Sequence, residues 1–353
     1  MPAEGWKNKK LLISLYDGCQ YRCEFCVYGY AKDKEPLSDQ ETMSTEDWCA
    51  LFAAAYAQGY RDLEIGGRGE PTLYPSFVQV VSRAHDIGFN IDLLTNGLND
   101  KAVIEVLPFI RQLKINLNGI DEVQLNKIHV PPPGFTFERC MASIKNIIST
   151  IVNNNFNIRI RTNYVVTTHS WKEAFTFPER INSLLADALG ERKLYIIFLH
   201  FHNYVKTPAE YLGFDDKGLN NILLLAMAGR RRPFLLENTN ILEFIQKTEV
   251  LIERLRPLSE NNSDSRRHAC YTCEQYKRIL FIDGNGDCYG CYNPFRTVNG
   301  LSKTEDPFFF GNVRAQRFEE IFCPAEGFNP KMDVTQIYWR PCLFCHAKGP
   351  VSA

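Results

Sequence analysis

Three cysteines near the start of the chain have the residue type and spacing of ligands for a soft metal. Cys19, Cys23 and Cys26 follow the apolar run of residues 11–16 with the spacing C-x3-C-x2-C. Thiolates bind zinc, copper(I) and iron–sulfur clusters. A structural zinc site is closed by four protein ligands, whereas three cysteines leave one iron of a cubane open to another molecule. The count favours an iron–sulfur cluster, and three structural thiols or half of a zinc ribbon are the alternatives.

The elements that must position these cysteines alternate between strands and helices. A capping box at Ser44 and Asp47 predicts the start of the first helix. Six strands are predicted, at residues 11–16, 63–65, 90–94, 113–117, 157–166 and 193–199. The helical patterns between them lie near residues 44–59, 74–85, 100–109, 137–152 and from about 171 onward. This alternation implies an α/β fold with a parallel sheet and right-handed crossovers.

Glycine-rich and polar loops follow the predicted strands. The second strand runs into residues 66–71, which read G-G-R-G-E-P, and glycines let a backbone approach a ligand closely. Together with Phe25 between the last two cysteines, this loop resembles the radical S-adenosylmethionine (SAM) superfamily. The resemblance implies a partial (β/α)6 barrel whose chemistry lies at the C-terminal mouth. It also implies a 4Fe–4S cluster on the three cysteines, with SAM bound to the open iron and cleaved to methionine and a 5′-deoxyadenosyl radical.

The same resemblance implies contacts between SAM and the loops. The glycine loop would hold the methionyl ammonium, although this copy has extra residues compared with the family's GGE(P). The family often has Ser-Leu-Asp-Gly where this chain has Asn116-Leu-Asn-Gly119, and an arginine where His129 stands; Arg161 could supply that charge instead. The predicted cofactor-binding residues are Phe25, Gly66, Gly67, Glu70, Thr95, Asn96, Asn116, Asn118 and Arg161. For each single asparagine or arginine, an ordinary turn or surface residue is the alternative.

A second group of seven cysteines lies beyond residue 268, and its alternative interpretation is a zinc ribbon. Residues 277–288 predict a hairpin with an Asp-Gly-Asn-Gly turn. The pattern from Cys273 through Gly286 to Cys291 resembles the SPASM and twitch extensions of radical SAM enzymes, which carry auxiliary 4Fe–4S clusters. Since a cubane takes four cysteines, we expect one auxiliary cluster, with a second possible. Its expected ligands are Cys273, Cys291, Cys342 and Cys345, which leaves Cys270, Cys288 and Cys323 unassigned.

Composition limits the setting in which the protein acts. The net charge of −1 over 353 residues gives no general attraction to nucleic acid or to anionic membranes. Neither a signal peptide nor a membrane span is evident, so the twelve cysteines indicate metal ligands in a reducing cytoplasm. We expect a barrel at residues 1–203, a helical segment and linker at 204–267, and a twitch/SPASM-like domain at 268–353.

The resemblance implies a radical SAM oxidoreductase, but it identifies the substrate less well. We expect hydrogen abstraction from a carbohydrate-like or other small molecule, an auxiliary cluster that assists oxidation, and a flavodoxin- or ferredoxin-type electron donor. A maturase that crosslinks or epimerises a ribosomally made precursor peptide is the alternative. The first strand begins by residue 11 and leaves no room for a peptide-recognition domain, which favours the small molecule. A non-catalytic iron–sulfur or zinc-binding protein is a third hypothesis, and no residue stands out as a catalytic base.

Overall fold

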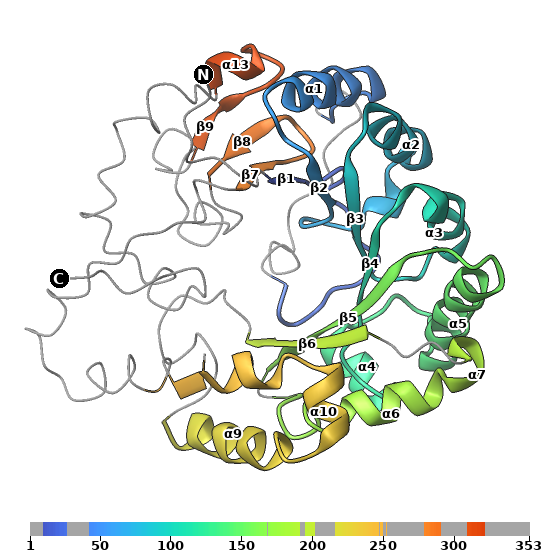
Figure 1. The fold of residues 1–353 in the computed structure, drawn as a ribbon, viewed down its shortest axis with the longest axis vertical. Helices are drawn as coiled ribbons and strands as arrows, with labels where there is room; N and C mark the ends of the chain where they lie inside the picture. The colour runs from blue at the N-terminus through green and yellow to red at the C-terminus, as the bar shows by residue number, and fades with distance from the viewer. Residues whose placement is uncertain are drawn as a thin grey trace, which may run out of the picture.

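The structure, a computed structural model, describes residues 10–26, 42–167, 169–190, 195–201, 216–246, 248–249, 252, 279–290 and 309–321. Its described strands form one curved sheet in the order β6-β5-β4-β3-β2-β1-β7-β8-β9 (Figure 1). They are β1 (Lys10–Ile13), β2 (Asp62–Ile65), β3 (Asn90–Thr95), β4 (Gln112–Asn116), β5 (Arg159–Val166), β6 (Tyr195–Phe201), β7 (Ile279–Ile282), β8 (Asp287–Tyr289) and β9 (Phe309–Asn312). Neighbours from β6 to β7 are parallel, whereas β8 pairs antiparallel with β7 and β9.

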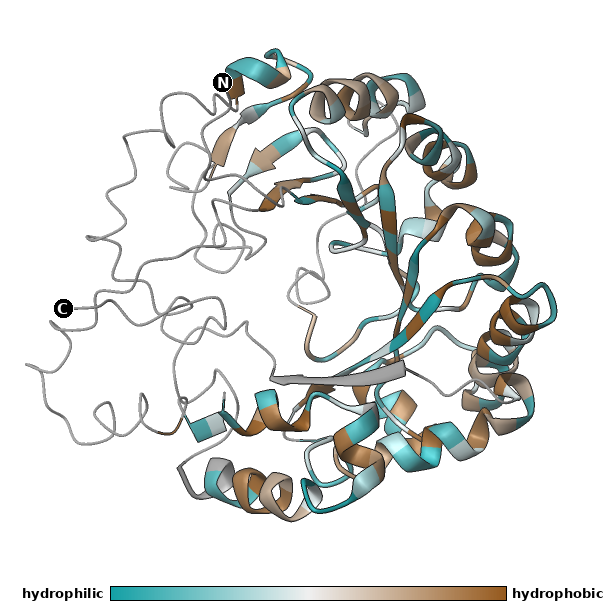
Figure 2. Cartoon of the chain, viewed as in Figure 1, coloured by the Kyte–Doolittle hydropathy of each residue, from teal (hydrophilic) through white to brown (hydrophobic). Residues whose placement is uncertain are grey.

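Helices cover the convex outer face of this sheet (Figure 1). The described helices are α1 (Thr45–Ala57), α2 (Phe77–Ile87), α3 (Asp100–Val106), α4 (Glu122–Ile128), α5 (Phe137–Asn153), α6 (Phe177–Leu184), α7 (Ala186–Leu189), α9 (Asp216–Gly229), α10 (Pro233–Asn238) and α13 (Phe318–Ile321). Two short 3-10 helices are η1 (Pro71–Leu73) and η2 (Leu107–Phe109). Figure 2 shows apolar residues on the sides of the helices that face the sheet. None of the described helices is long and apolar enough to cross a membrane.

The strands divide their side chains between an apolar and a polar face. Leu63 and Ile65 of β2 are fully buried in the main core with residues of α1 and α2, such as Phe52 and Val80. Glu64, between them, points to the opposite face, because successive side chains of a strand alternate. The inner face of the sheet is therefore polar, and the outer face supplies the hydrophobic core.

The six predicted strands are confirmed, and each begins or ends within a few residues of its predicted position. The capping box is also confirmed, because the Ser44 hydroxyl accepts a hydrogen bond from Asp47 N and the Asp47 carboxylate accepts one from Ser44 N. Two helices begin later than predicted: α2 follows η1, and α6 starts at Phe177 after a series of turns. Helix α4 was not predicted at all.

The predicted hairpin of residues 277–288 is confirmed as β7 and β8. Strand β7 pairs in parallel with β1, with Leu11 opposite Leu280 and Ile13 opposite Ile282. Residues assigned to the third domain from sequence thus continue the barrel sheet beyond its first strand. The hairpin is fixed directly beside the strand that leads into the cysteine loop.

Candidate active site

The three cysteines lie on the loop that follows β1, and this loop is attached to the end of α4. Arg22 N donates to His129 O at 3.0 Å, and Glu24 N donates to Ile128 O at 2.8 Å. Cys23 is buried, Cys26 is half-buried and Cys19 is exposed. The loop therefore presents its thiols from a backbone that is held at two points.

The donor set suits a cluster better than a single ion. Among the described residues, no three His, Cys, Asp or Glu side chains lie close enough together to share one metal ion. A cubane binds each thiolate through a different iron, so its ligands need not converge on one point. Cys19, Cys23 and Cys26 on one short loop fit a 4Fe–4S cluster, whereas a structural zinc site takes four protein ligands.

His129 lies at the back of the cysteine loop and is fully buried. Its Nδ1 is 3.0 Å from Cys23 Sγ, and its Nε2 accepts a hydrogen bond from Asn118 N at 2.8 Å. The rings of Tyr21 and Phe25 pack against the imidazole, with centroids 4.9 and 5.7 Å away. Burial lowers the pKa of His129 to about 3, so the ring is neutral. His129 stands where the family often has an arginine for the SAM carboxylate, and its burial between these groups does not support that role.

The G-G-R-G-E-P loop packs directly on the cysteine loop. Gly66 N donates to Ile13 O at 2.9 Å, and Glu70 N donates to Gly18 O at 2.8 Å. Gly69 has a φ of +61°, and a Cβ there would lie 2.2 Å from Tyr16 O and 2.5 Å from Gly18 O. Position 69 therefore requires glycine, because two backbones approach each other too closely for any side chain.

Glu70 connects the loop after β2 with the loop after β3, and the residue is 2% exposed. Oε1 accepts hydrogen bonds from Thr72 N at 3.3 Å, from Thr72 Oγ1 at 2.8 Å and from Thr95 Oγ1 at 2.6 Å. Oε2 accepts one from Asn96 N at 2.8 Å. Burial raises the pKa of Glu70, and these hydrogen bonds oppose the increase. Both oxygens are thus engaged inside the protein.

Three asparagine amides on β4, just after it and within β5 have buried oxygens without a hydrogen-bond partner among the described residues: Asn116, Asn118 and Asn163. Asn116 and Asn163 are opposite each other in the β4–β5 register. Asn118 Nδ2 donates to Val165 O at 2.5 Å, which leaves its oxygen as the free group. Buried acceptors are normally paired, so these oxygens fit a polar ligand. Asn163 was missed from sequence, although it stands two residues beyond Arg161 on the same face of the strand.

The side chain of Asn96, after β3, faces the cysteine loop. Its Nδ2 donates to Gln20 Oε1 at 3.0 Å and lies 3.9 Å from Cys19 Sγ. The structure thus places Asn96 beside the cysteine loop, whereas Thr95 contacts Glu70; the roles of both residues toward SAM stay predictions.

Arg161 lies in a charged layer of the inner face. It is opposite Lys114 in the β4–β5 register, two residues before the Asn116–Asn163 pair. Lys114 Nζ is 2.7 Å from Glu64 Oε2 and 3.4 Å from Asp92 Oδ2, and Lys10 also pairs with Glu64. Because it precedes the Asn116–Asn163 pair by two residues in the register, Arg161 lies one layer farther from the C-terminal end of β4 than these asparagines.

The extra Arg68 of the glycine loop reaches the β7–β8 hairpin. Its Nη1 is 2.8 Å from Asp283 Oδ2, and both side chains are buried. The guanidinium also lies 5.8 Å from the ring centroid of Phe281 and 5.9 Å from that of Tyr289. Burial raises the pKa of Asp283 to about 7, although Arg68 opposes the shift.

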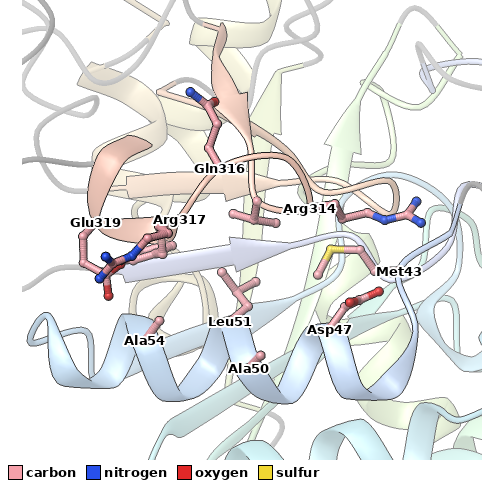
Figure 3. A pocket seen from close by; sticks show the side chains of 11 residues that line it. Met43, Asp47, Ala50, Leu51, Ala54, Arg314, Gln316, Arg317 and Glu319 are labelled. Carbon is pink, nitrogen blue, oxygen red and sulfur yellow. The ribbon is translucent and has the colours of Figure 1, made fainter.

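The predicted auxiliary ligands Cys273, Cys291, Cys342 and Cys345 lie outside the described residues, as do Cys270 and Cys323. Cys288 is described: it is fully buried on β8 and packs in the main core. A pocket between α1 and the β9–α13 segment contains none of the candidate site residues (Figure 3). It is lined by Leu51 and Phe318, with Asp47 and Arg317 at its polar positions.

Comparison with known proteins assigns a family to part of the chain. Residues 13–173 match the model described as the radical SAM superfamily. The S-adenosylmethionine-dependent nucleotide dehydratase of Thermoplasmatales archaeon (strain ISO4-H5) is 23% identical over 51% of this chain and 63% of that protein. The PqqA peptide cyclase of Ruegeria pomeroyi is 25% identical over 55% of this chain and 48% of that protein. This chain thus spans about half to just under two thirds of the length of these relatives.

Solved structures share the fold. Streptococcus suis SuiB bound to S-adenosylmethionine has a TM-score of 0.57 at 16% identity, over 89% of this chain and 65% of that one. SuiB bound to its precursor peptide SuiA also gives 0.57, at 18% identity over 90% and 65%. Residues 13–173 thus form a radical SAM domain, and the solved structures show a (β/α)-barrel fold; the radical SAM superfamily binds a 4Fe–4S cluster and SAM.

Proposed function

We propose that this radical SAM enzyme is an oxidoreductase that removes a hydrogen atom from an unactivated carbon of a small polar molecule. Cys19, Cys23 and Cys26 would hold the cluster, which with SAM supplies a 5′-deoxyadenosyl radical when both are bound. One observation carries the proposal: backbone hydrogen bonds hold the cysteine loop against the glycine loop and the end of α4. These loops follow the C-terminal ends of β1 and β2.

The chain's own residues would position SAM and the substrate. Gly66 and Gly67 would present their backbone to SAM. Glu70 N donates to Gly18 O of the cysteine loop, and Asn96 Nδ2 lies 3.9 Å from Cys19 Sγ. The unpartnered oxygens of Asn116, Asn118 and Asn163 supply acceptors for hydroxyl or amino groups, which a carbohydrate-like substrate or the SAM ribose offers. Their cost when unpaired is removed when a ligand donates to them.

The test of the SAM-cleaving function is reductive cleavage by anaerobically reconstituted protein. With dithionite as the electron source, wild-type protein should convert SAM to 5′-deoxyadenosine, and Cys23→Ala should abolish both the conversion and the cluster iron. Cys49→Ala is the matched control, because it removes a half-buried thiol of α1. Undiminished cleavage by Cys23→Ala would remove the basis of the proposal.

The twitch-like auxiliary cluster belongs to the same proposal and rests on the cysteine pattern beyond residue 268. Replacing Cys342 and Cys345 with alanine should lower iron by about four atoms per chain. SAM cleavage should persist, since the first three cysteines remain, but substrate should not be converted to product. Zinc in place of this iron in anaerobically purified protein would restore the ribbon hypothesis.

A second candidate, modification of a precursor peptide, is favoured by the names of two relatives, PqqA peptide cyclase and peptide-bound SuiB. The two candidates differ in which deuterated pool passes deuterium to 5′-deoxyadenosine. Small-molecule and peptide fractions of a deuterated extract should be supplied separately, with a flavodoxin- or ferredoxin-type donor. Transfer from the peptide fraction alone would replace the small-molecule proposal.

A further inference from the structure

His129 is placed to act on the cluster through Cys23. The contact of 3.0 Å between Nδ1 and Cys23 Sγ joins two residues that are both buried, and 106 positions separate them in sequence. The side chain approaches the thiol from the end of α4, whose backbone also holds the cysteine loop through Ile128 O and His129 O. The ring is thus fixed to the loop that carries its partner.

The second ring nitrogen determines which group donates. Asn118 N is an N–H donor and points at Nε2 from 2.8 Å, so Nε2 must carry a lone pair and not a hydrogen. In a neutral imidazole the hydrogen is then on Nδ1. Nδ1 is therefore a donor, and Cys23 Sγ is the acceptor.

Aromatic packing keeps this hydrogen bond away from water. Tyr21 and Phe25 lie against the imidazole, and Leu125 and Ile128 complete a small apolar cluster with Cys23. A hydrogen bond is electrostatically stronger in such surroundings than in water. Donors to a cluster's sulfur atoms are one of the factors that set its reduction potential.

We propose that His129 donates a hydrogen bond from Nδ1 to the Cys23 thiolate and thereby raises the reduction potential of the SAM-binding cluster. When the cluster accepts one electron from a low-potential donor, it passes from the 2+ to the 1+ state and its thiolates become more negative. The hydrogen bond stabilises this reduced state more than the oxidised one, and no proton moves. His129 is a positioning residue in this role, and Asn118 N sets its tautomer. The proposal rests on the proposed assignment of the cluster to Cys19, Cys23 and Cys26.

The experiment separates the two ring nitrogens. His129→Asn puts an amide near the place of Nδ1 and keeps a donor for Cys23, whereas His129→Gln puts one near the place of Nε2 and keeps an acceptor for Asn118 N. His129→Leu removes both. The midpoint potential of the reconstituted cluster, without SAM, is measured by dithionite titration with EPR detection, and iron content is determined for each protein.

We expect wild type and His129→Asn to agree. His129→Gln and His129→Leu should both favour the oxidised cluster by about tenfold, which lowers the midpoint by 59 mV for one electron. A structural role alone would make Asn and Gln equivalent, so equal midpoints for these two variants, or an unchanged midpoint in His129→Leu, would overturn the proposal.

A measurement on wild-type protein covers the case in which the variants lose their iron. With ¹⁵N-histidine labelling, the reduced cluster should show hyperfine coupling to a histidine nitrogen, and no coupling would overturn the proposal. Failure of the underlying assignment is distinguishable, because wild-type protein would then have no cluster whose EPR spectrum changes when SAM is added.

Discussion

Glu70 tests how the glycine loop and the loop after β3 are held together. Its carboxylate could brace the two loops or contact SAM directly, and these two roles predict different results. The sequence assigns it to SAM, whereas the structure places four donors from Thr72, Thr95 and Asn96 around it. In Glu70→Gln, one amide end becomes a donor and faces a backbone N–H, either that of Asn96 or that of Thr72. A buried N–H without an acceptor costs about 1–3 kcal/mol, and hydrogen bonds to a charged group are the stronger ones.

We therefore expect Glu70→Gln to lower the free energy of unfolding by about 2–3 kcal/mol, with weaker SAM binding as a consequence of the displaced loops. The assay is anaerobic urea unfolding together with a SAM titration. Glu105→Gln, on an exposed position of α3, is the matched control and should change stability by less than about 0.5 kcal/mol. Unchanged stability with tens-fold weaker SAM binding would refute the bracing role and favour direct contact with SAM.

Two further perturbations test the barrel interior and the loop contact. Lys114 and Lys10 outweigh the effect of burial and lower the pKa of Glu64 from 4.5 to about 2; since one unit is about 1.4 kcal/mol, Glu64→Gln should cost about 3 kcal/mol at pH 7. The native state releases this proton at lower pH than the unfolded chain, so the difference between variant and wild type in urea unfolding should shrink as pH falls from 4.5 toward 2; a constant difference would contradict it. Gly69→Ala should lose both iron and SAM binding, because its Cβ meets two backbone oxygens. The control is Gly59→Ala, where φ is +89° and nothing lies within 4 Å of the added Cβ. It should lower the free energy of unfolding by only about 1–2 kcal/mol and keep its iron.

Local patterns were enough to predict the strands and most helices. Apolar runs bounded by turns located β1 to β6, and Ser44 with Asp47 located the start of α1. Helix α4 was missed because its sequence has no clear apolar stripe: only Leu125 and Ile128 of the helix are buried, and Val123 is 75% exposed.

The site was only partly accessible from sequence, because its decisive contacts join distant positions. The cysteine spacing is local and was recognised, but the partner of Cys23 lies 106 residues away on a helix that was not predicted. Glu70 meets Asn96 across 26 residues. Neither contact has a sequence pattern, since one histidine or glutamate in a loop is compatible with many roles.

The departure of the glycine loop from the family's GGE(P) pattern can be understood from the fold. Arg68, one of the extra residues, joins Asp283 of the β7–β8 hairpin, and Ser14 Oγ donates to Arg68 O at 2.6 Å. Met43 N donates to Gly284 O at 2.7 Å, and β7 itself pairs with β1. A displacement of the hairpin would therefore strain the glycine loop, because residues 66–71 carry both Arg68, which contacts the hairpin, and Glu70. Arg68 thus joins the glycine loop to the β7–β8 hairpin, which continues the barrel sheet beside β1.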